Sequence, residues 1–184
     1  MAIENRYEFL YYVACTNANP NGDPDMGNSP RLDPETMQGF ITDVATKRRI
    51  RNYIQTAYAG QPGMNIIVQQ ATNLNRHIAE AKRAAGVADC AKEKEAVYAG
   101  RKKACELFYD VRTFGAVMTT FVKAALNCGQ VRGPVQLGFA RSVEPVVPQE
   151  VTITRVAITT EADAEKKGTE MGRKYVVPYA LYRG

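Results

Sequence analysis

A long turn-rich segment between an apolar strand and a cationic helix places the strongest constraint on this fold. Residues 19–34 contain four prolines, interleaved with Asn, Asp, Ser and Gly. Proline fixes φ and Asx side chains cap their own backbone, so this composition predicts consecutive turns. A loop of this length without periodicity is usually functional or disordered. The fixed φ angles favour a stiff functional loop, and Arg31 with the cations of the next helix predicts a surface that meets an anion.

A strand is predicted before this loop and a helix after it. Residues 7–14 are aromatic and β-branched, and their near-continuous apolarity favours a central strand covered on both faces. Thr42 is a good N-cap for a helix that runs to about Tyr58, and Asp43 suits its positive end. At helical spacing the core-facing side chains are Val44, Ile50, Ile54, Ala57 and Tyr58.

Three cations of this helix, Lys47, Arg48 and Arg51, lie within or beside the apolar arc, whereas Arg49 points roughly the opposite way. One interpretation is a solvated helix whose long side chains extend from the edge of the core to water. The other is a ridge of cations, where helix and loop meet, spaced to follow phosphates. The pattern on this helix leaves both interpretations open.

The middle of the chain is predicted to be mostly helical. Residues 64–69 form a strand candidate, followed by a helix over 72–85 that is capped by its first residue and ends at Gly86. A further helix over 90–109 carries runs of Lys and Glu, which predict a solvent-facing excursion. Residues 110–117 then return to the core.

After Gly129 the pattern becomes that of strands. Residues 135–140 alternate as a half-buried strand, which Pro145 and Pro148 interrupt. Apolar residues occupy odd-numbered positions before Arg155 and even-numbered positions after it. This shift predicts a bulge or strand break near Arg155.

The end of the chain predicts an exposed excursion followed by a final strand. Residues 159–172 are polar and charged, and residues 173–182 form the strand, in which Pro178 requires an edge or a bulge. One face of this strand is predicted to hold Tyr175, Val177, Tyr179 and Leu181. The chain stops at Gly184 while the strand is still apolar, so we expect a C-terminally short chain with an exposed apolar edge.

Composition limits which partners, cofactors and cellular location we expect for this chain. The formal net charge of +5 is a modest basic bias, which alone is weak evidence for a nucleic-acid partner. The four cysteines contain no C-x-x-C pair, and His77 is the only histidine, so we expect reduced thiols, no cofactor and no metal. No apolar run reaches membrane-spanning length, and we expect a cytoplasmic protein without a membrane partner.

A set of ordered motifs adds a family resemblance. The motifs are N-P-N-G-D-P-D at 19–25, P-R-L-D-P-E-T at 30–36, T-D-V-A-T-K-R-R-I-R at 42–51, D-V-R-T-F-G-A at 110–116, V-R-G-P-V at 131–135, and I-T-R at 153–155 with M-G-R-K-Y-V-V-P-Y at 171–179. Together they resemble the Cascade backbone subunit, the seventh CRISPR-associated protein family, most like type I-C. Each motif is weak alone, but the ordered set spans the chain and is highly specific.

The resemblance implies an α/β (α+β) fold: a modified RNA-recognition-motif, ferredoxin-like palm with a helical finger insertion and a thumb hairpin. On this chain it implies one domain over 1–184, with the finger at 60–110 and the thumb-like excursion at 155–173. It further implies a non-catalytic subunit whose copies stack head to tail along a guide RNA. The partners would be the guide RNA, target DNA paired through the guide, and other Cascade subunits.

The resemblance also assigns RNA-binding roles to individual residues. The backbone-gripping and thumb positions correspond to Arg31, Lys47, Arg48, Arg51, Arg112, Arg141, Arg155, Met171, Arg173 and Lys174, with Met171 as the apolar wedge. A protein that holds any guide needs phosphate contacts and wedges that stack on any base, because neither reads sequence.

Two other functions stay open from the residues. A metal-dependent ribonuclease, as in type III backbone subunits, would use the loop acids, with Asp33 as the candidate catalytic residue. Turn capping explains the same acids, and their spacing is not that of an EF-hand. A generic α/β scaffold with an incidental basic bias is the third interpretation.

Overall fold

The structure is a computed structural model that describes residues 3–87, 94–119, 127–157, 161 and 168–184. Helices and antiparallel sheets are both abundant, which confirms the α+β class. The chain divides into two compact units: Met1–Ala45 with Gly138–Gly184, and Thr46–Leu137. The second unit is inserted in sequence between the two halves of the first, and it contains the predicted finger segment. The RNA-recognition-motif likeness and the finger and thumb boundaries stay predictions.

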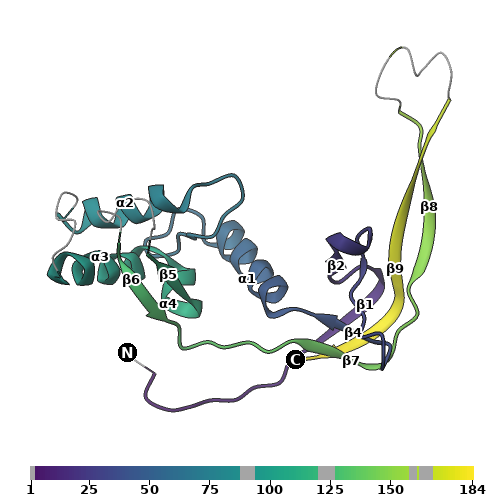
Figure 1. Cartoon of the computed structure of the whole chain (residues 1–184), viewed down its shortest axis with the longest axis horizontal. Coiled ribbons are helices and arrows are strands. Elements are labelled where there is room, and N and C mark those ends of the chain that lie inside the picture. The colour runs from purple at the N-terminus through teal and green to yellow at the C-terminus, as the bar shows by residue number, and fades with distance from the viewer. Residues whose placement is uncertain (1–2, 88–93, 120–126, 158–160, 162–167) are drawn as a thin grey trace. The chain divides into compact units, whose positions relative to one another are not determined.

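The elements follow one another in chain order (Figure 1). They are β1 (Tyr12–Ala18), β2 (Gly22–Asp23), the 3-10 helix η1 (Pro24–Met26), β3 (Ser29–Pro30), β4 (Gln38–Ile41), α1 (Asp43–Ala57), α2 (Leu74–Ala84), α3 (Lys94–Leu107), α4 (Tyr109–Phe114), β5 (Gly115–Met118), β6 (Gly129–Arg132), β7 (Ala140–Pro145), β8 (Gln149–Arg155) and β9 (Glu170–Arg183).

The first unit is built on a five-stranded sheet in the order β1-β9-β7-β4, with β8 also paired to β9. All its pairings are antiparallel. The long strand β9 pairs with β8 as far as Val176 and with β7 at Tyr182. Pro178 lies in the interval between these two ladders, in agreement with the tolerance of proline where a strand lacks a partner on one side. The core beneath the sheet consists of Cys15, Ile41, Ala140, Val146, Val177, Ala180 and Tyr182.

The prediction for the first strand of this unit is wrong in detail. The first strand begins at Tyr12 instead of Tyr7, and β1 pairs only with β9 among the described strands, so it is an edge strand. On β9, Tyr179 is 64% exposed, whereas Val177 of the same predicted face is buried, as is Tyr182. Apolar alternation does not tell which strands pair, so it could not show that β1 lies at the edge of the sheet.

The second unit packs α2 against α3, with α4 and the β5–β6 hairpin beside them. Its core consists of Ile67, Ile78, Ala81, Ala104, Phe108, Val111, Met118 and Cys128. The cap of α2 is Asn73, one residue after the predicted position, and Gly86 follows the helix with φ of 71°. α3 lies within the predicted 90–109 helix, whose first four residues are outside the described part.

Two predicted strands of this region are absent from the described residues. Residues 64–69 form no strand, although Ile66 and Ile67 are buried. Residues 135–139 lie between β6 and β7 and also form none. Apolar residues in these segments differ in burial, since Ile66 and Ile67 are buried whereas Val68 and Phe139 are 42% and 51% exposed. The apolar pattern therefore did not suffice to predict a strand in either segment.

Candidate nucleic-acid interface

The turn-rich loop is fastened to the start of α1 by one asparagine. The Oδ1 atom of Asn21 accepts the backbone N–H and the hydroxyl of Thr42, each at 3.0 Å. The Oγ1 atom of Thr42 in turn accepts the N–H of Ala45 at 3.3 Å, which confirms Thr42 as the N-cap. The loop and the helix start are therefore held in one geometry by side-chain bonds.

The acids of the loop cap turns. Asp23 accepts the N–H of Asp25 at 3.1 Å and pairs with Arg31 at 3.3 Å. Asp33 accepts the N–H of Glu35 at 3.1 Å and pairs with Arg141 at 3.4 Å. The hydrogen bond from Glu35 is the largest cause that lowers the pKa of Asp33 below its ordinary value. Within the described ranges, no three His, Cys, Asp or Glu side chains converge as metal ligands would.

Arg31 lies on this loop with one polar atom unsatisfied. Its side chain is about one-quarter exposed. Its Nε atom is buried and has no hydrogen-bond partner among the residues that the structure describes. A buried donor without a partner is uncommon and marks a place where a ligand or water can bind.

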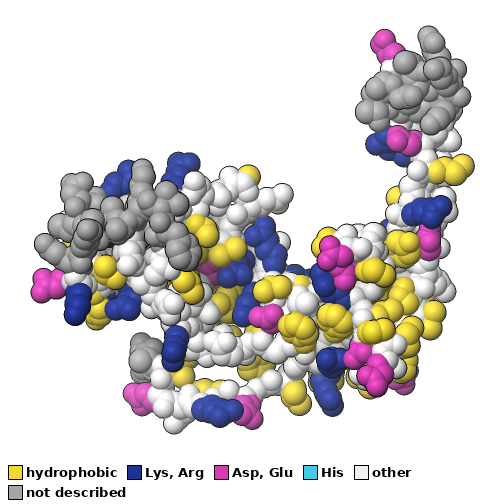
Figure 2. Space-filling view, viewed as in Figure 1, with side chains coloured by type: hydrophobic (Ala, Val, Ile, Leu, Met, Phe, Trp, Pro, Cys, Tyr) yellow, Lys and Arg dark blue, Asp and Glu magenta, His cyan; other side chains and the backbone are white. Residues whose placement is uncertain are grey.

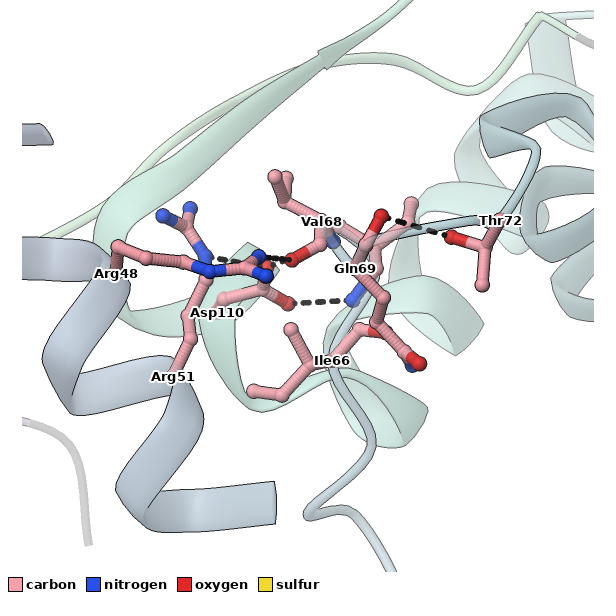
Figure 3. Close-up of polar contacts among 8 residues, drawn as sticks. Arg48, Arg51, Ile66, Val68, Gln69, Thr72 and Asp110 are labelled. Atoms are coloured by element: carbon pink, nitrogen blue, oxygen red, sulfur yellow. Dashed lines mark hydrogen bonds and ion pairs between the residues drawn. The ribbon is translucent and has the colours of Figure 1, made fainter. Parts of the chain in front are cut away.

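The cations of α1 contact residues of their own unit (Figure 3). The Nε atom of Arg51 donates to Oδ2 of Asp110 at 2.8 Å. Arg48 donates to the carbonyl of Val68 at 3.2 Å. Lys47 and Arg51 lie over the ring of Phe114, at 5.9 and 5.3 Å from its centroid. The sequence grouped these cations correctly but missed the partner that organises them.

That partner, Asp110, is the structural residue that sequence reasoning overlooked. It is 1% exposed and also accepts the N–H groups of Ile67 and Val68, at 2.9 and 3.2 Å. An acid at the first turn of a short apolar segment, within the D-V-R-T-F-G-A motif, was the available signal. Arg51 therefore has a structural bond at Nε, while Figure 3 shows its two terminal nitrogens directed away from Asp110.

Arg112 is likewise held by its own unit. It donates to the carbonyl groups of Gly63 and Cys105, the latter at 3.4 Å, and it lies 5.4 Å from the ring centroid of Tyr109. These contacts join α4 to α3 and to the segment between α1 and α2. Its predicted contact with RNA is untested.

The remaining predicted residues lie on the β8–β9 ribbon, a two-stranded extension of the first unit (Figure 1). Every residue of β8 is exposed, and Met171 on β9 is 74% exposed. Arg155 pairs with Glu170, and Arg173 pairs with Glu150 at 3.1 Å. Figure 2 shows these opposite charges beside one another along the ribbon.

Strand register divides these residues between two faces. Alternate side chains of a strand point to opposite faces, so Met171 and Arg173 share one face with Thr152 and Thr154. Arg155 and Lys174 share the other face with Val151 and Ile153. Each face of the ribbon therefore combines apolar or small side chains with cations.

Comparison with known proteins decides the family. The family model for CRISPR-associated protein Cas7 matches residues 5–184. The chain belongs to the Cas7 family. It is also 28% identical over 181 residues to a CRISPR-associated protein Cas7 of Haloferax volcanii, an alignment that covers 91% of this chain and 52% of that protein. The chain thus spans about half the length of the curated relative it matches.

For this Cas7 family member, the structure groups the predicted residues into separate sets within each unit. The first unit holds Arg31, Arg141 and the ribbon residues, and the second holds Lys47, Arg48, Arg51 and Arg112. No helix in the described part of the chain has the length and apolarity needed to cross a membrane.

Proposed function

We propose that this chain is a non-catalytic, RNA-binding backbone subunit of a type I, I-C-like CRISPR surveillance complex. It grips a guide RNA through its phosphates and displays the bases for pairing with target DNA. Family membership and the ordered motifs support the class of complex. The single observation that carries the RNA-binding part is the exposed ribbon, with the Met171 side chain open to solvent and cations on both faces.

The exposed ribbon needs a partner. A two-stranded hairpin alone is marginally stable in water, and β8 is exposed along its whole length. A strand of RNA or a neighbouring copy of the subunit that lies against the ribbon would bury this surface. We therefore propose the ribbon as the thumb and Met171 as the side chain that displaces a base.

The cations of the ribbon are available to phosphates despite their ion pairs. Arg155 and Arg173 are more than half exposed, and so is Arg155's partner Glu170. Exposed ion pairs of this kind contribute only about 0.2–1 kcal/mol. A polyanion can therefore replace Glu150 and Glu170 at little cost. Lys174, opposite Val151, adds a third cation.

The other proposed contacts come from the loop and from α1. Arg31 offers a buried donor that no described group accepts, and Arg141 is about half exposed. Lys47 and Arg48 lie on α1, where Arg51 presents its terminal nitrogens beyond Asp110. None of these groups has to contact the edge of a base, because each would bind a phosphate. A guide of any sequence would therefore bind.

The proposed assembly follows from the same surfaces. Copies of the subunit stack head to tail along the guide, with other Cascade subunits at the ends and target DNA paired to the displayed bases. The complex acts in the cytoplasm.

The test is guide-RNA affinity as a function of salt. Replacement of Arg155, Arg173 and Lys174 by Gln removes three proposed phosphate contacts. For a single strand, each lost contact lowers the slope of log affinity against log salt by about 0.7, so we expect a decrease of about 2. The matched control is Lys103→Gln, because Lys103 pairs with Glu106 on α3 and belongs to the other unit. Equal slopes for the triple variant and the control would overturn the ribbon's role.

A further inference from the structure

A pocket in the second unit lies outside every residue assigned above. It is formed by α3 and β6 and has a volume of about 350 Å³. Its lining consists of Tyr98, Arg101, Lys102, Cys105, Gln130 and Val131. Small-molecule pockets in proteins begin at about 300 Å³, but this one is shallow and largely open to solvent, so it offers a surface on which a flat group can lie.

An exposed aromatic ring and a fixed guanidinium form the mouth of the pocket. Tyr98 is 61% exposed, although its ring is large and apolar. The guanidinium of Arg101 lies 5.4 Å from the centroid of that ring. Arg101 also donates to the carbonyl of Gln130 at 3.4 Å. Since a guanidinium has five N–H donors, most of them stay available to a ligand.

The pocket is positively charged. Arg101 and Lys102 are the two charged residues of its lining, and no carboxylate belongs to that lining. In the part of the chain that the structure describes, the nearby acid Glu106 pairs with Lys103 at 3.0 Å. Among the described residues, the lining of the pocket therefore holds no counter-ion for Arg101 and Lys102, which favours an anionic ligand.

We propose that this pocket binds an unpaired nucleotide of a single strand. The base stacks on Tyr98, and the adjoining phosphate binds Arg101 and Lys102. Stacking on an aromatic ring next to cations is how proteins hold single strands without reading sequence. Cys105 and Val131 supply the apolar floor beneath the base, and the amide of Gln130 lies at its edge.

This site is a second nucleic-acid contact, additional to the proposed guide grip. It uses a different element, α3, and none of the residues assigned to the guide. An acidic peptide would satisfy the two cations but would leave the exposed ring uncovered. An unpaired nucleotide covers the ring with its base and pairs the cations with its phosphate. The acidic peptide is included in the test as the alternative ligand.

Cys105 offers a direct reporter, since its thiol lines the pocket. Cys15 and Cys128 are buried, and Cys90 is replaced by Ser in the test protein. Burial raises the pKa of the Cys105 thiol, so a maleimide is added at about pH 8.5, near the ordinary thiol pKa. The full chain is titrated with penta-deoxythymidylate, penta-uridylate, adenosine 5′-monophosphate, inorganic phosphate or penta-glutamate, and the rate of Cys105 labelling is followed.

We expect both oligonucleotides to slow labelling several-fold and saturably, and Tyr98→Leu to weaken that protection about tenfold. Lys102→Gln weakens it too, whereas the matched control Lys103→Gln leaves it unchanged. Equal protection by phosphate alone or by penta-glutamate would overturn the nucleotide assignment, and so would the absence of any protection. A preference between the two oligonucleotides tells whether the strand is RNA or DNA. Because the ribbon variants leave the pocket intact, failure here and failure of the guide grip are distinguishable.

Discussion

Nε of Arg51 on α1 donates to Oδ2 of Asp110 on α4 across 2.8 Å, and this bond organises the cationic part of the second unit. The same carboxylate holds the backbone of Ile67 and Val68. Three segments that are distant in sequence therefore meet at one buried acid. The pair is a structural link between α1 and α4.

Removal of Asp110 should destabilise the protein strongly. Asp110→Ala leaves two backbone N–H groups and the Arg51 guanidinium without their acceptor, which costs about 3–5 kcal/mol. Urea unfolding followed by circular dichroism measures the change in the free energy of unfolding. The control is Asn52→Ala on the exposed side of α1, with an expected change within about 0.5 kcal/mol. A loss below about 1 kcal/mol for Asp110→Ala would contradict the linking role.

A methyl group at Gly39 should clash with the buried ring of Tyr182. An added Cβ would lie 2.7 Å from the Oη atom and 3.1 Å from Cε1 of that ring. Overpacking of this kind costs about 1–3 kcal/mol, so Gly39→Ala should lower the free energy of unfolding by that amount. Tyr182→Phe removes the nearest atom. In a double-mutant cycle the two changes should therefore cost less together than their sum, and strict additivity would exclude the contact.

Stability at alkaline pH should depend on Tyr182. Burial raises the pKa of this phenol to about 12, above the ordinary value of about 10. Since the folded protein disfavours the phenolate, the contribution of Tyr182 is complete below the unfolded pKa and is lost as pH rises from about 10 towards 12. Tyr182→Phe should remove that loss. Urea unfolding of both proteins between about pH 9 and 11.5 measures it, and parallel pH profiles would contradict the prediction.

The carboxylate of Asp33 should stay ionised in acid. The N–H of Glu35 is the main cause that lowers its pKa, and the Arg141 side chain adds a smaller effect. A depressed folded pKa stabilises the protein above the ordinary carboxyl pKa, and this stability is lost as pH falls through the folded value. Carboxyl-carbon NMR titration should show Asp33 below the ordinary range. Arg141→Gln should raise its pKa only slightly, and a large rise would mean that the ion pair dominates.

Asp33 also provides the test between a backbone subunit and a ribonuclease. Both of its oxygens accept bonds from the chain itself, so we expect the assembled complex to leave complementary RNA intact in Mg²⁺. The measurement is the length of labelled RNA after incubation. Cleavage that Asp33→Ala abolishes, with Asp25→Ala as the matched loop variant, would favour the ribonuclease.

Local features of this protein could be predicted from the sequence because neighbouring residues encode them. The Thr42 cap and the extent of α1 depend on bonds within a few residues, and the prolines near residues 145 and 178 restrict the backbone locally. The ordered motifs placed the chain in its family for the same reason, since they are runs of adjacent residues. The grouping of cations on α1 was also visible, because helical spacing determines which side chains are neighbours.

Only the tertiary structure decided which groups meet across the chain. Periodicity cannot show that β9 leaves β8 for β7, or that Tyr182 is buried where β9 meets β7. It cannot show that a carboxylate 59 positions away holds Arg51, or that Tyr98 and Gln130 share a pocket. Burial and pairing between distant segments arise from packing of the whole unit. The residues that neighbour a position in the sequence do not show which distant segment it will contact.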